Sequence, residues 1–324
     1  MDNKKLKVCV IGGGVIGLYL SWKLSELGHE VFVYDRKEEK DLGFKSCSTL
    51  VSERIRQFIP RIDDCLENII NSCDINFPKK TIRLNFSPKH LVLDRDKLIK
   101  ILLDLNKKNN VKLCFGKELK EIPRGFDRVI GCDGAGSFVR KSLGLPNPNM
   151  RIGIQVFEEK KDNSCVTKTH LIPSGFTWEI PRGNFVEYGA LGEQNEAKQS
   201  LDELLDIKDV KKRKYISALV PQGLIIPNND KITLCGDAMG LTKPWSGGGL
   251  IWGLYAADML IKSFPDFIEY KKQTEKFFNF KIIKGRIANK LVNLFGFYFP
   301  YVIPKEMTYD NDFPNFLIAF AGKK

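Results

Sequence analysis

The chain has 324 residues, of which 43% are hydrophobic and 28% charged, so it has enough apolar side chains for a large core and is not a disordered protein. Its formal net charge is +12, and we expect a basic surface suited to an anionic membrane surface, acidic redox carriers or phosphorylated substrates. Because no basic-aromatic module or recognition helix of the usual kinds is visible, nucleic acid is not an expected partner.

The first predicted elements form half of a nucleotide-binding unit. Residues 6–11 predict a strand and residues 15–27 a helix, and the turn between them has the G-x-G-x-x-G spacing. Such glycines let bare backbone approach a pyrophosphate at the positive end of the helix and let the helix pack closely on the strand. The three glycines are Gly12, Gly14 and Gly17.

A second strand, predicted over residues 30–34, ends in Asp35. This carboxylate is placed to accept hydrogen bonds from ribose hydroxyls, and Arg36 beside it is a further candidate contact. A strand, a glycine turn, a helix, a strand and an acid within about 30 residues form a far more specific signal than the glycines alone. We therefore predict a bound dinucleotide at this end of the sheet.

The chain then alternates between helix-like and strand-like runs. We predict helices over residues 51–73, 94–107, 199–214 and 246–263. We predict strands over residues 76–86, 111–115, 128–132, 152–157, 166–172, 177–180, 185–191, 215–220 and 232–235. This order indicates an α/β fold in which a Rossmann-type domain is interrupted by an inserted antiparallel-sheet substrate domain.

The predicted domain boundaries follow from that alternation. The nucleotide-binding domain is expected to comprise residues 1–73, 90–146 and 227–263. The substrate domain is expected to comprise residues 74–89 and 147–226, and residues 264–324 a C-terminal helical cap.

Two more glycine–acid signals follow strand-like runs. Asp133 and Gly134 come after the first of these strands, and Gly236 and Asp237 come after the second. Together with the first glycine turn they suit separate parts of a flavin nucleotide. We therefore predict FAD as the cofactor.

The sequence argues against metal sites, a secretory signal and a membrane span. The eight cysteines contain no Cys-x-x-Cys pair, so zinc and iron–sulfur ligation are not expected. The amino end is polar, and no apolar run approaches the roughly 18 residues that a bilayer requires. Free thiols suit a reducing compartment, so we expect a cytoplasmic protein, with a peripheral place at the inner membrane face as an open alternative.

A basic amphipathic helix is predicted near the carboxyl end. From Lys271 to Lys290 there are seven lysines and arginines and one acid, Glu275, and apolar residues recur every three or four positions. Two interpretations stay open. The helix packs on the protein with its lysines in water, or it presents a face to a membrane or a lipidic substrate.

With these signals placed, residues 6 to about 262 resemble the flavoprotein superfamily of aromatic hydroxylases, flavin halogenases and geranylgeranyl reductases. The segment from Gly236 to Gly249 resembles the reductase pattern GDA-G-x-x-x-P-x-x-G-G-G, whereas hydroxylases usually carry histidine at the position of Gly240. The resemblance therefore favours the geranylgeranyl reductase branch, and within it the archaeal digeranylgeranylglycerophospholipid reductase-like enzymes.

The resemblance also assigns roles to residues near the cofactor. It implies that the two later glycine–acid motifs lie on FAD and that Arg95, which opens a predicted helix, lies beside it. Gly247 and Gly248 open the helix predicted over residues 246–263, so their N–H groups and the positive helix end are expected to face the flavin.

A further motif runs from Phe176 to Arg182 and resembles the Tyr-x-Trp-x-Phe-Pro-Lys motif of geranylgeranyl reductases, with phenylalanine, isoleucine and arginine replacing tyrosine, phenylalanine and lysine. It also resembles the Trp-x-Trp-x-Ile-Pro motif of flavin halogenases. Alternate strand positions share a face, so Phe176 and Trp178 are expected to line an apolar pocket, unless both pack in the sheet core. Pro181 and Trp245 complete the predicted substrate residues.

Cys47 is the candidate catalytic residue. It stands where archaeal family members carry a cysteine loop that faces the flavin, although no glycine follows it here. The resemblance implies a proton donor or a pocket thiol at this position. The alternative is an unreactive loop cysteine.

The resemblance implies a reaction and its partners. Reduced FAD is expected to deliver hydride to one carbon of an isoprenoid double bond while a proton reaches the other carbon. A polyprenyl lipid is the expected substrate, and NAD(P)H or a ferredoxin-like carrier is the expected electron donor. The alternatives are an FAD-dependent monooxygenase, namely a hydroxylase or a halogenase that uses Lys79 or Lys80, and a non-catalytic flavin- or lipid-binding protein.

Overall fold

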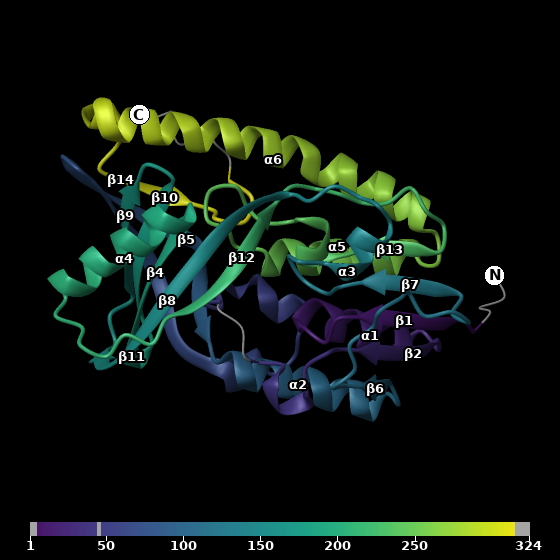
Figure 1. Ribbon diagram of the computed structural model, residues 1–324. Coiled ribbons are helices and arrows are strands. Elements are labelled where there is room, and N and C mark those ends of the chain that lie inside the picture. The colour runs from purple at the N-terminus through teal and green to yellow at the C-terminus, as the bar shows by residue number, and fades with distance from the viewer. Residues whose placement is uncertain (1–4, 44–46, 315–324) are drawn as a thin grey trace.

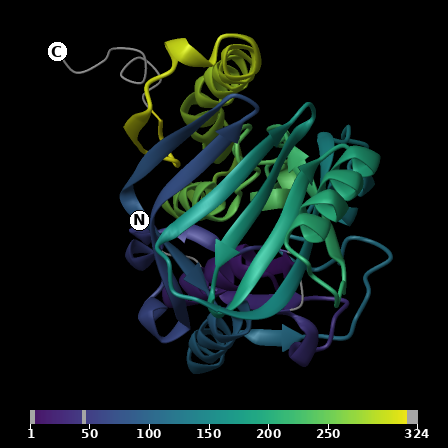
Figure 2. The same cartoon turned by 90° about the vertical axis from the view of Figure 1, so that its left-hand side faces the viewer.

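The computed structural model describes residues 5–43 and 47–314. Two sheets lie next to one another, and one long helix, α6, runs along the outside of the molecule from the first sheet to the second (Figure 1). The view turned by 90° shows the same helix at the edge of the larger sheet (Figure 2). The predicted α/β architecture is confirmed.

The smaller sheet is wholly parallel, with the strand order β13-β7-β1-β2-β6. Its strands are β1 (Lys7–Ile11), β2 (Glu30–Tyr34), β6 (Lys112–Cys114), β7 (Arg128–Gly131) and β13 (Ile232–Leu234). Helices cover its faces, so its central strands are near-continuous apolar runs, as expected of a buried parallel sheet. This is the predicted Rossmann-type sheet.

The α-helices are α1 (Val15–Glu26), α2 (Arg95–Lys108), α3 (Phe138–Ser142), α4 (Gln194–Ile207), α5 (Leu250–Ser263) and α6 (Phe267–Tyr298). Helix α1 contacts both α2 and α5, and α5 contacts α6, so one core joins these helices to the parallel sheet. The carboxylates of Asp94 and Asp266 accept backbone N–H groups at the starts of α2 and α6, which fixes where both helices begin.

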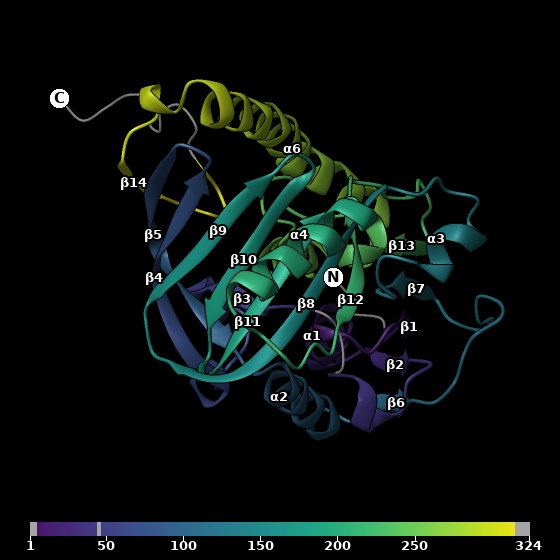
Figure 3. The same cartoon turned by 60° about the vertical axis from the view of Figure 1, so that its left-hand side comes forward.

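The larger sheet has nine strands and is mixed. Its order is β12-β8-β11-β10-β9-β4-β5-β14, and β3 pairs with β5. Its strands are β3 (Leu50–Ser52), β4 (Leu66–Phe77), β5 (Lys80–Leu93), β8 (Asn149–Asp162), β9 (Val166–Ile172), β10 (Gly175–Pro181), β11 (Gly183–Gly192), β12 (Ile216–Gln222) and β14 (Glu306–Tyr309). Helix α4 packs on one face of this sheet (Figure 3). The predicted antiparallel sheet is present, but it is mixed, because the pairs β4–β9 and β5–β14 are parallel.

The helix predicted over residues 51–73 is also wrong. This segment forms β3, two 3₁₀-helices, η2 (Glu53–Gln57) and η3 (Ile62–Cys65), and then most of β4. The strand predicted over residues 76–86 is the end of β4, the hairpin turn and the first half of β5. The other 3₁₀-helices are η1 (Glu39–Asp41), η4 (Gly236–Met239) and η5 (Pro300–Val302).

Several helix boundaries differ from prediction, and the helix predicted over residues 246–263 begins only at Leu250. The helix predicted over residues 199–214 is α4, which ends at Ile207 because Asp209 adopts a left-handed conformation, with a φ of 55°, that a helix does not continue through. The basic amphipathic helix extends beyond its predicted core and becomes α6, with 32 residues. Within the described residues, no helix combines the length and the apolar character needed to cross a bilayer.

The predicted domain division stays a prediction. Strand β5 runs through its boundary at residue 90, and β14 pairs with β5 although it belongs to the predicted cap.

Candidate functional site

A single cavity of about 1030 Å³ lies where the carboxyl ends of the parallel strands face the larger sheet. Residues that follow four of those strands line it: Gly12 after β1, Asp35 after β2, Asp133 after β7 and Asp237 after β13. In open α/β sheets, ligands bind in this crevice at the carboxyl edge. The three glycine–acid signals of the sequence therefore meet at one place.

The first glycine turn has two kinds of glycine. Gly12 has a φ of 113°, and an added Cβ there would overlap the carbonyl oxygen of Cys132, while a Cβ at Gly17 would overlap the carbonyl oxygen of Gly12. A Cβ at Gly14 would meet no atom within 4 Å, because this glycine borders the cavity. Gly12 and Gly17 hold the turn against its neighbours, and Gly14 keeps the backbone bare toward a ligand.

Asp35 positions this turn. Its carboxylate accepts a hydrogen bond of 2.7 Å from the Gly13 N–H and one of 2.8 Å from the Lys37 N–H. Asp35 and Arg36 both line the cavity. Since a carboxylate can accept about four hydrogen bonds, Asp35 has capacity left for the hydroxyls of a ligand.

Two polar side-chain atoms on the cavity wall are buried without a protein partner. The Oδ2 atom of Asp133 accepts the N–H groups of Phe138 and Val139 at the start of α3, but its Oδ1 is unpaired, and so is Nε of Arg95. Burial raises the pKa of the Asp133 carboxyl, although hydrogen bonds from Ser137 and from the backbone oppose this shift. Unpaired buried polar groups are costly, so a ligand that pairs with Arg95 and Asp133 fits this wall.

Arg140, which sequence reasoning missed, joins two loops of the site. Its guanidinium is fully buried and donates hydrogen bonds of 2.6 Å to the carbonyl oxygen of Ala238 and 2.7 Å to that of Ala135. The loop after β7 and the loop after β13 are thereby held at a fixed spacing. No local signal marks this role, because nearly a hundred residues separate Arg140 from Ala238.

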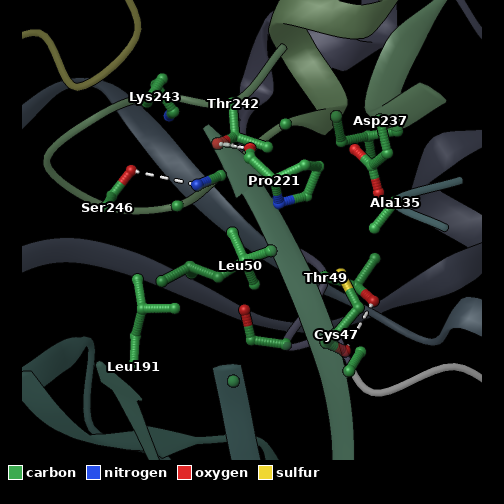
Figure 4. Close-up of a pocket in the computed structure, with 18 of the residues that line it drawn as sticks. Cys47, Thr49, Leu50, Ala135, Leu191, Pro221, Asp237, Thr242, Lys243 and Ser246 are labelled. Atoms are coloured by element: carbon green, nitrogen blue, oxygen red, sulfur yellow. Dashed lines mark hydrogen bonds between the residues drawn. The ribbon is translucent and has the colours of Figure 1, made fainter. Parts of the chain in front are cut away.

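The loop between η4 and α5 forms another wall. The Thr242 hydroxyl donates to the Pro221 carbonyl oxygen at 2.6 Å, and the Ser246 hydroxyl accepts from the Gly248 N–H (Figure 4). Gly247, with a φ of 69°, and Gly248 line the cavity just before α5 begins. The positive end of a helix therefore faces the cavity, as the sequence predicted.

Lys243 is a second residue that the sequence analysis missed. It is 7% exposed at its side chain, lines the cavity, and its Nζ lies 3.1 Å from Oδ1 of Asp312, which is fully buried. The Asp312 carboxylate also accepts from Ser52 and, at 3.0 Å, from Arg54. In the sequence, the one indication that Lys243 belongs to the site was its position just before Pro244 in the glycine-rich loop.

The predicted substrate residues are only partly gathered at the cavity. Phe176 and Trp178 line it from one face of β10 with ring centroids 5.9 Å apart, and Trp245 lines it from the loop before α5. Pro181 is buried in β10, where it is the register partner of Val186, and does not line the cavity. Gly17 and Gly236 do not line it either, since each packs against neighbouring backbone or side chains.

Trp178 and Arg182 converge on one buried carboxylate. Glu187 is fully buried, and its carboxylate accepts a hydrogen bond of 2.9 Å from Nε1 of Trp178 and one of 2.8 Å from Nη1 of Arg182. Burial raises the pKa of Glu187, and the charge of Arg182 opposes that shift. Arg182 also donates to the Ser48 carbonyl oxygen at 2.6 Å, so the aromatic motif positions the segment that carries Cys47.

Cys47 lines the cavity as a free thiol that is partly exposed. Its carbonyl oxygen accepts from the Thr49 hydroxyl at 3.3 Å (Figure 4). Around the strand that carries Pro221, Figure 4 places Cys47 and Thr49 opposite the loop of Thr242 and Ser246. The residues described form no cluster of His, Cys, Asp and Glu that would hold a metal ion.

The far end of the cavity is apolar. It lies between the β4–β5 hairpin, β9, α6 and the segment after α6. Among the described residues that line this end, none carries a charge. Those with apolar side chains are Ile75, Phe77, Ile82, Leu84, Phe86, Leu171, Val292, Phe295, Ile303 and Met307.

Comparison with known proteins places this fold among flavoproteins. No protein-family model matches the chain. A kynurenine 3-monooxygenase from Anopheles gambiae is 25% identical over 226 residues, which is 57% of this chain and 46% of that protein. A 3-(3-hydroxy-phenyl)propionate/3-hydroxycinnamic acid hydroxylase from Escherichia coli is 21% identical over 304 residues, which is 78% of this chain and 54% of that protein. The chain spans about half the length of these curated relatives.

Among solved structures, a geranylgeranyl bacteriochlorophyll reductase-like protein from Thermoplasma acidophilum has a TM-score of 0.77 and 21% identity, covering 88% of this chain and 87% of that one. The halogenase PltM in complex with FAD has a TM-score of 0.62 and 14% identity, covering 88% of this chain and 74% of that one. At these identities the likeness is one of fold. The predicted resemblance to a geranylgeranyl reductase-like protein is thereby confirmed at the level of the fold alone.

Proposed function

We propose that this chain is an FAD-dependent oxidoreductase that saturates carbon–carbon double bonds of an isoprenoid lipid. The observation that carries the proposal is the cavity itself, in which a nucleotide-type edge and an uncharged apolar channel are continuous. A dinucleotide and an elongated apolar substrate can therefore meet inside one chain.

The residues of the nucleotide-type edge fit FAD. Gly14 and Gly134 leave open space where a Cβ would stand, which permits the close approach of a pyrophosphate to the backbone. Arg95 and Asp133 offer a buried donor and a buried acceptor that lack protein partners. Asp35 is held by two backbone N–H groups at the end of β2, the position from which a carboxylate accepts ribose hydroxyls.

The apolar channel fits a polyprenyl chain. It is lined by the side chains named above, and its polar members, such as Asn289 and Asn293, are neutral. Phe176 and Trp178 line the same cavity from β10 and would orient a double bond. An isolated alkene offers no carbonyl to share developing charge, so positioning and exclusion of water must supply much of the catalysis.

FAD, when bound, would supply the hydride chemistry, and the protein would supply binding, orientation and a proton. Saturation of one double bond consumes two electrons and two protons, so one carbon receives hydride and the other a proton. The Cys47 thiol is the candidate proton donor because it lines the cavity and is free.

A flavin monooxygenase is the second candidate, because both curated relatives are named as a monooxygenase or a hydroxylase. Halogenation is less well supported. Lys79 and Lys80 are not among the described residues that line the cavity, and Nζ of Lys80 donates to the Pro300 carbonyl oxygen at 3.0 Å.

The test is an anaerobic single turnover. The purified protein is loaded with FAD and reduced with dithionite, and the excess dithionite is then removed. The reduced protein is mixed with geranylgeranyl lipid while the flavin spectrum and the product mass are followed. Flavin reoxidation with a gain of two mass units per bond supports the reductase. Reoxidation that requires oxygen and is stimulated by an aromatic substrate favours the monooxygenase, and FAD binding without either result favours a non-catalytic flavoprotein.

A further inference from the structure

The outer face of α6 is an uncovered apolar stripe. Six large apolar side chains on this face are between 39% and 72% exposed: Phe280, Ile283, Ile287, Leu291, Leu294 and Tyr298. At about 100° per residue they fall within an arc of about 80°, and they extend about 27 Å along the helix. Phe299, Tyr301 and Val302 continue the exposed apolar surface beyond the helix end.

The stripe has basic flanks and no acidic ones. Between residues 276 and 305 the chain contains six lysines and arginines and no aspartate or glutamate. Lys284 and Lys290 stand on opposite sides of the stripe on the helical projection. Nζ of Lys284 lies 4.2 Å from the ring centroid of Phe280, so its stem covers apolar surface while its charge stays in water.

The inner face of the same helix borders the cavity. Ala288, Asn289, Val292, Asn293 and Phe295 line the apolar channel. Helix α6 therefore separates that channel from the apolar stripe by the width of one helix. Figures 1 and 2 show α6 on the outside of the molecule, beside the hairpin that forms the other wall of the channel.

We propose that this stripe, with residues 298–302, is the surface by which the protein binds an anionic lipid bilayer. A helix with an apolar face, lysine-rich flanks and too little apolar length to span a membrane lies in the headgroup layer with its apolar side chains inserted. Charge complementarity selects an anionic bilayer over a neutral one and over a second copy of this basic chain. Bound in this way, the protein holds the apolar channel next to the lipid phase.

The test is co-sedimentation of the full chain with vesicles of pure phosphatidylcholine and of phosphatidylcholine mixed with phosphatidylglycerol, at low and high salt. We expect binding to the mixed vesicles that weakens with salt. The double variant Ile283→Gln/Ile287→Gln and the double variant Lys284→Gln/Lys290→Gln should each lower the partition coefficient about tenfold or more. Ile207→Gln is the matched control, since Ile207 is 78% exposed but lies on α4, and it should bind as the wild type does.

Three results would overturn the proposal. These are no binding to the mixed vesicles, equal binding by the isoleucine variant and the wild type, or a dimer in sedimentation velocity that the isoleucine variant abolishes, which would assign the stripe to self-association. FAD affinity is measured on the same variants. Because none of the four substituted residues lines the cavity, it should not change, and a failed membrane test leaves the FAD proposal standing.

Discussion

Lys243 and Asp312 form a buried ion pair that joins the loop before α5 to the segment after β14, with Nζ 3.1 Å from Oδ1. The two partners are not equally replaceable. Asp312 accepts hydrogen bonds from Ser52 and Arg54 as well as from Lys243. For Lys243, the ion-pair partner in the structure is the Asp312 carboxylate. Removing the acid therefore strands a buried cation, and removing the lysine leaves an acid that still has partners.

The first prediction follows from this asymmetry. Asp312→Asn should lower the free energy of unfolding by about 3–5 kcal/mol, the cost of an unpaired buried charge, and Lys243→Met by less than about 2 kcal/mol. Urea denaturation of both variants and of the double variant measures the difference. Equal losses for the two single variants would contradict the interpretation.

His90 provides a test by pH. Burial and then the charge of Lys243 lower its pKa from 6.5 to about 4, while Asp312 and Asp310 oppose the shift. His90 is therefore protonated below about pH 6.5 in the unfolded chain but only below about pH 4 in the folded chain. Stability should fall across this window by about 3 kcal/mol and lose no more from this group below it.

The measurement is urea denaturation at pH 7, 5.5 and 4.5 for the wild type and for His90→Gln. The variant should lose less stability between pH 7 and pH 4.5 than the wild type. The titration of Asp312 does not interfere with this comparison. Burial raises the pKa of its carboxyl, but Lys243 and Ser52 bring the net pKa below its usual range. The stability that the ionised Asp312 contributes is therefore lost only at a pH below the range of this experiment.

Gly14 and Gly17 form a matched pair for the cofactor site. Gly14→Ala places a methyl group in open space at the cavity, so it should cost less than about 1 kcal/mol of stability while lowering FAD affinity at least tenfold. Gly17→Ala forces a Cβ into the Gly12 carbonyl and should cost about 1–3 kcal/mol. Flavin-fluorescence titration and denaturation curves on both variants separate binding from folding. Unchanged FAD affinity in Gly14→Ala would contradict the assignment of this turn as the FAD site.

Cys47 is tested through turnover. Cys47→Ala should slow product formation about 100-fold if the thiol donates the proton, with FAD affinity unchanged. Cys47→Ser should recover part of the rate. A rate equal to that of the wild type would make Cys47 an unreactive loop residue.

The local signals of the sequence predicted the nucleotide-binding half well. The strand, glycine turn, helix and strand of residues 6–34 depend on neighbours in the chain, and β2 was predicted to the residue. Residues 66–73 were misassigned because two bulges in β4, between Leu66 and Asn68 and between Ile70 and Ser72, shift the strand alternation. Their apolar side chains then recur at three- and four-residue spacing, which imitates a helix.

The missed site residues depend on contacts that cross the chain. Lys243 lies 69 residues from Asp312, and Asn311 reaches His90 across 221 residues. Apart from the place of Lys243 in the glycine-rich loop, these residues belong to no motif, so nothing local in the sequence indicates how they pair. Pro181 is a different case: alternate strand positions share a face, so Pro181, three residues after Trp178, lies on the opposite face of β10 and packs away from the cavity.

Arg182 stands where the geranylgeranyl reductase motif has lysine, and its contacts give the reason for the difference. Its guanidinium binds Glu187 and Glu67 at 2.8 and 2.6 Å and donates to the carbonyl oxygens of Ser48 and Leu93. A lysine ammonium has three donors on one atom and cannot reach these four groups from two sides.

We therefore expect Arg182→Met to lower the free energy of unfolding by about 3–5 kcal/mol, because Glu187 would keep only its hydrogen bond from Trp178 in a fully buried place. Arg182→Lys should fall between Arg182→Met and the wild type. Glu67→Gln is the control and should cost less than about 1 kcal/mol, since Glu67 is 29% exposed. Denaturation measures all three, and if Arg182→Lys matched the wild type, the forked geometry of the guanidinium would not be what holds the Cys47 segment.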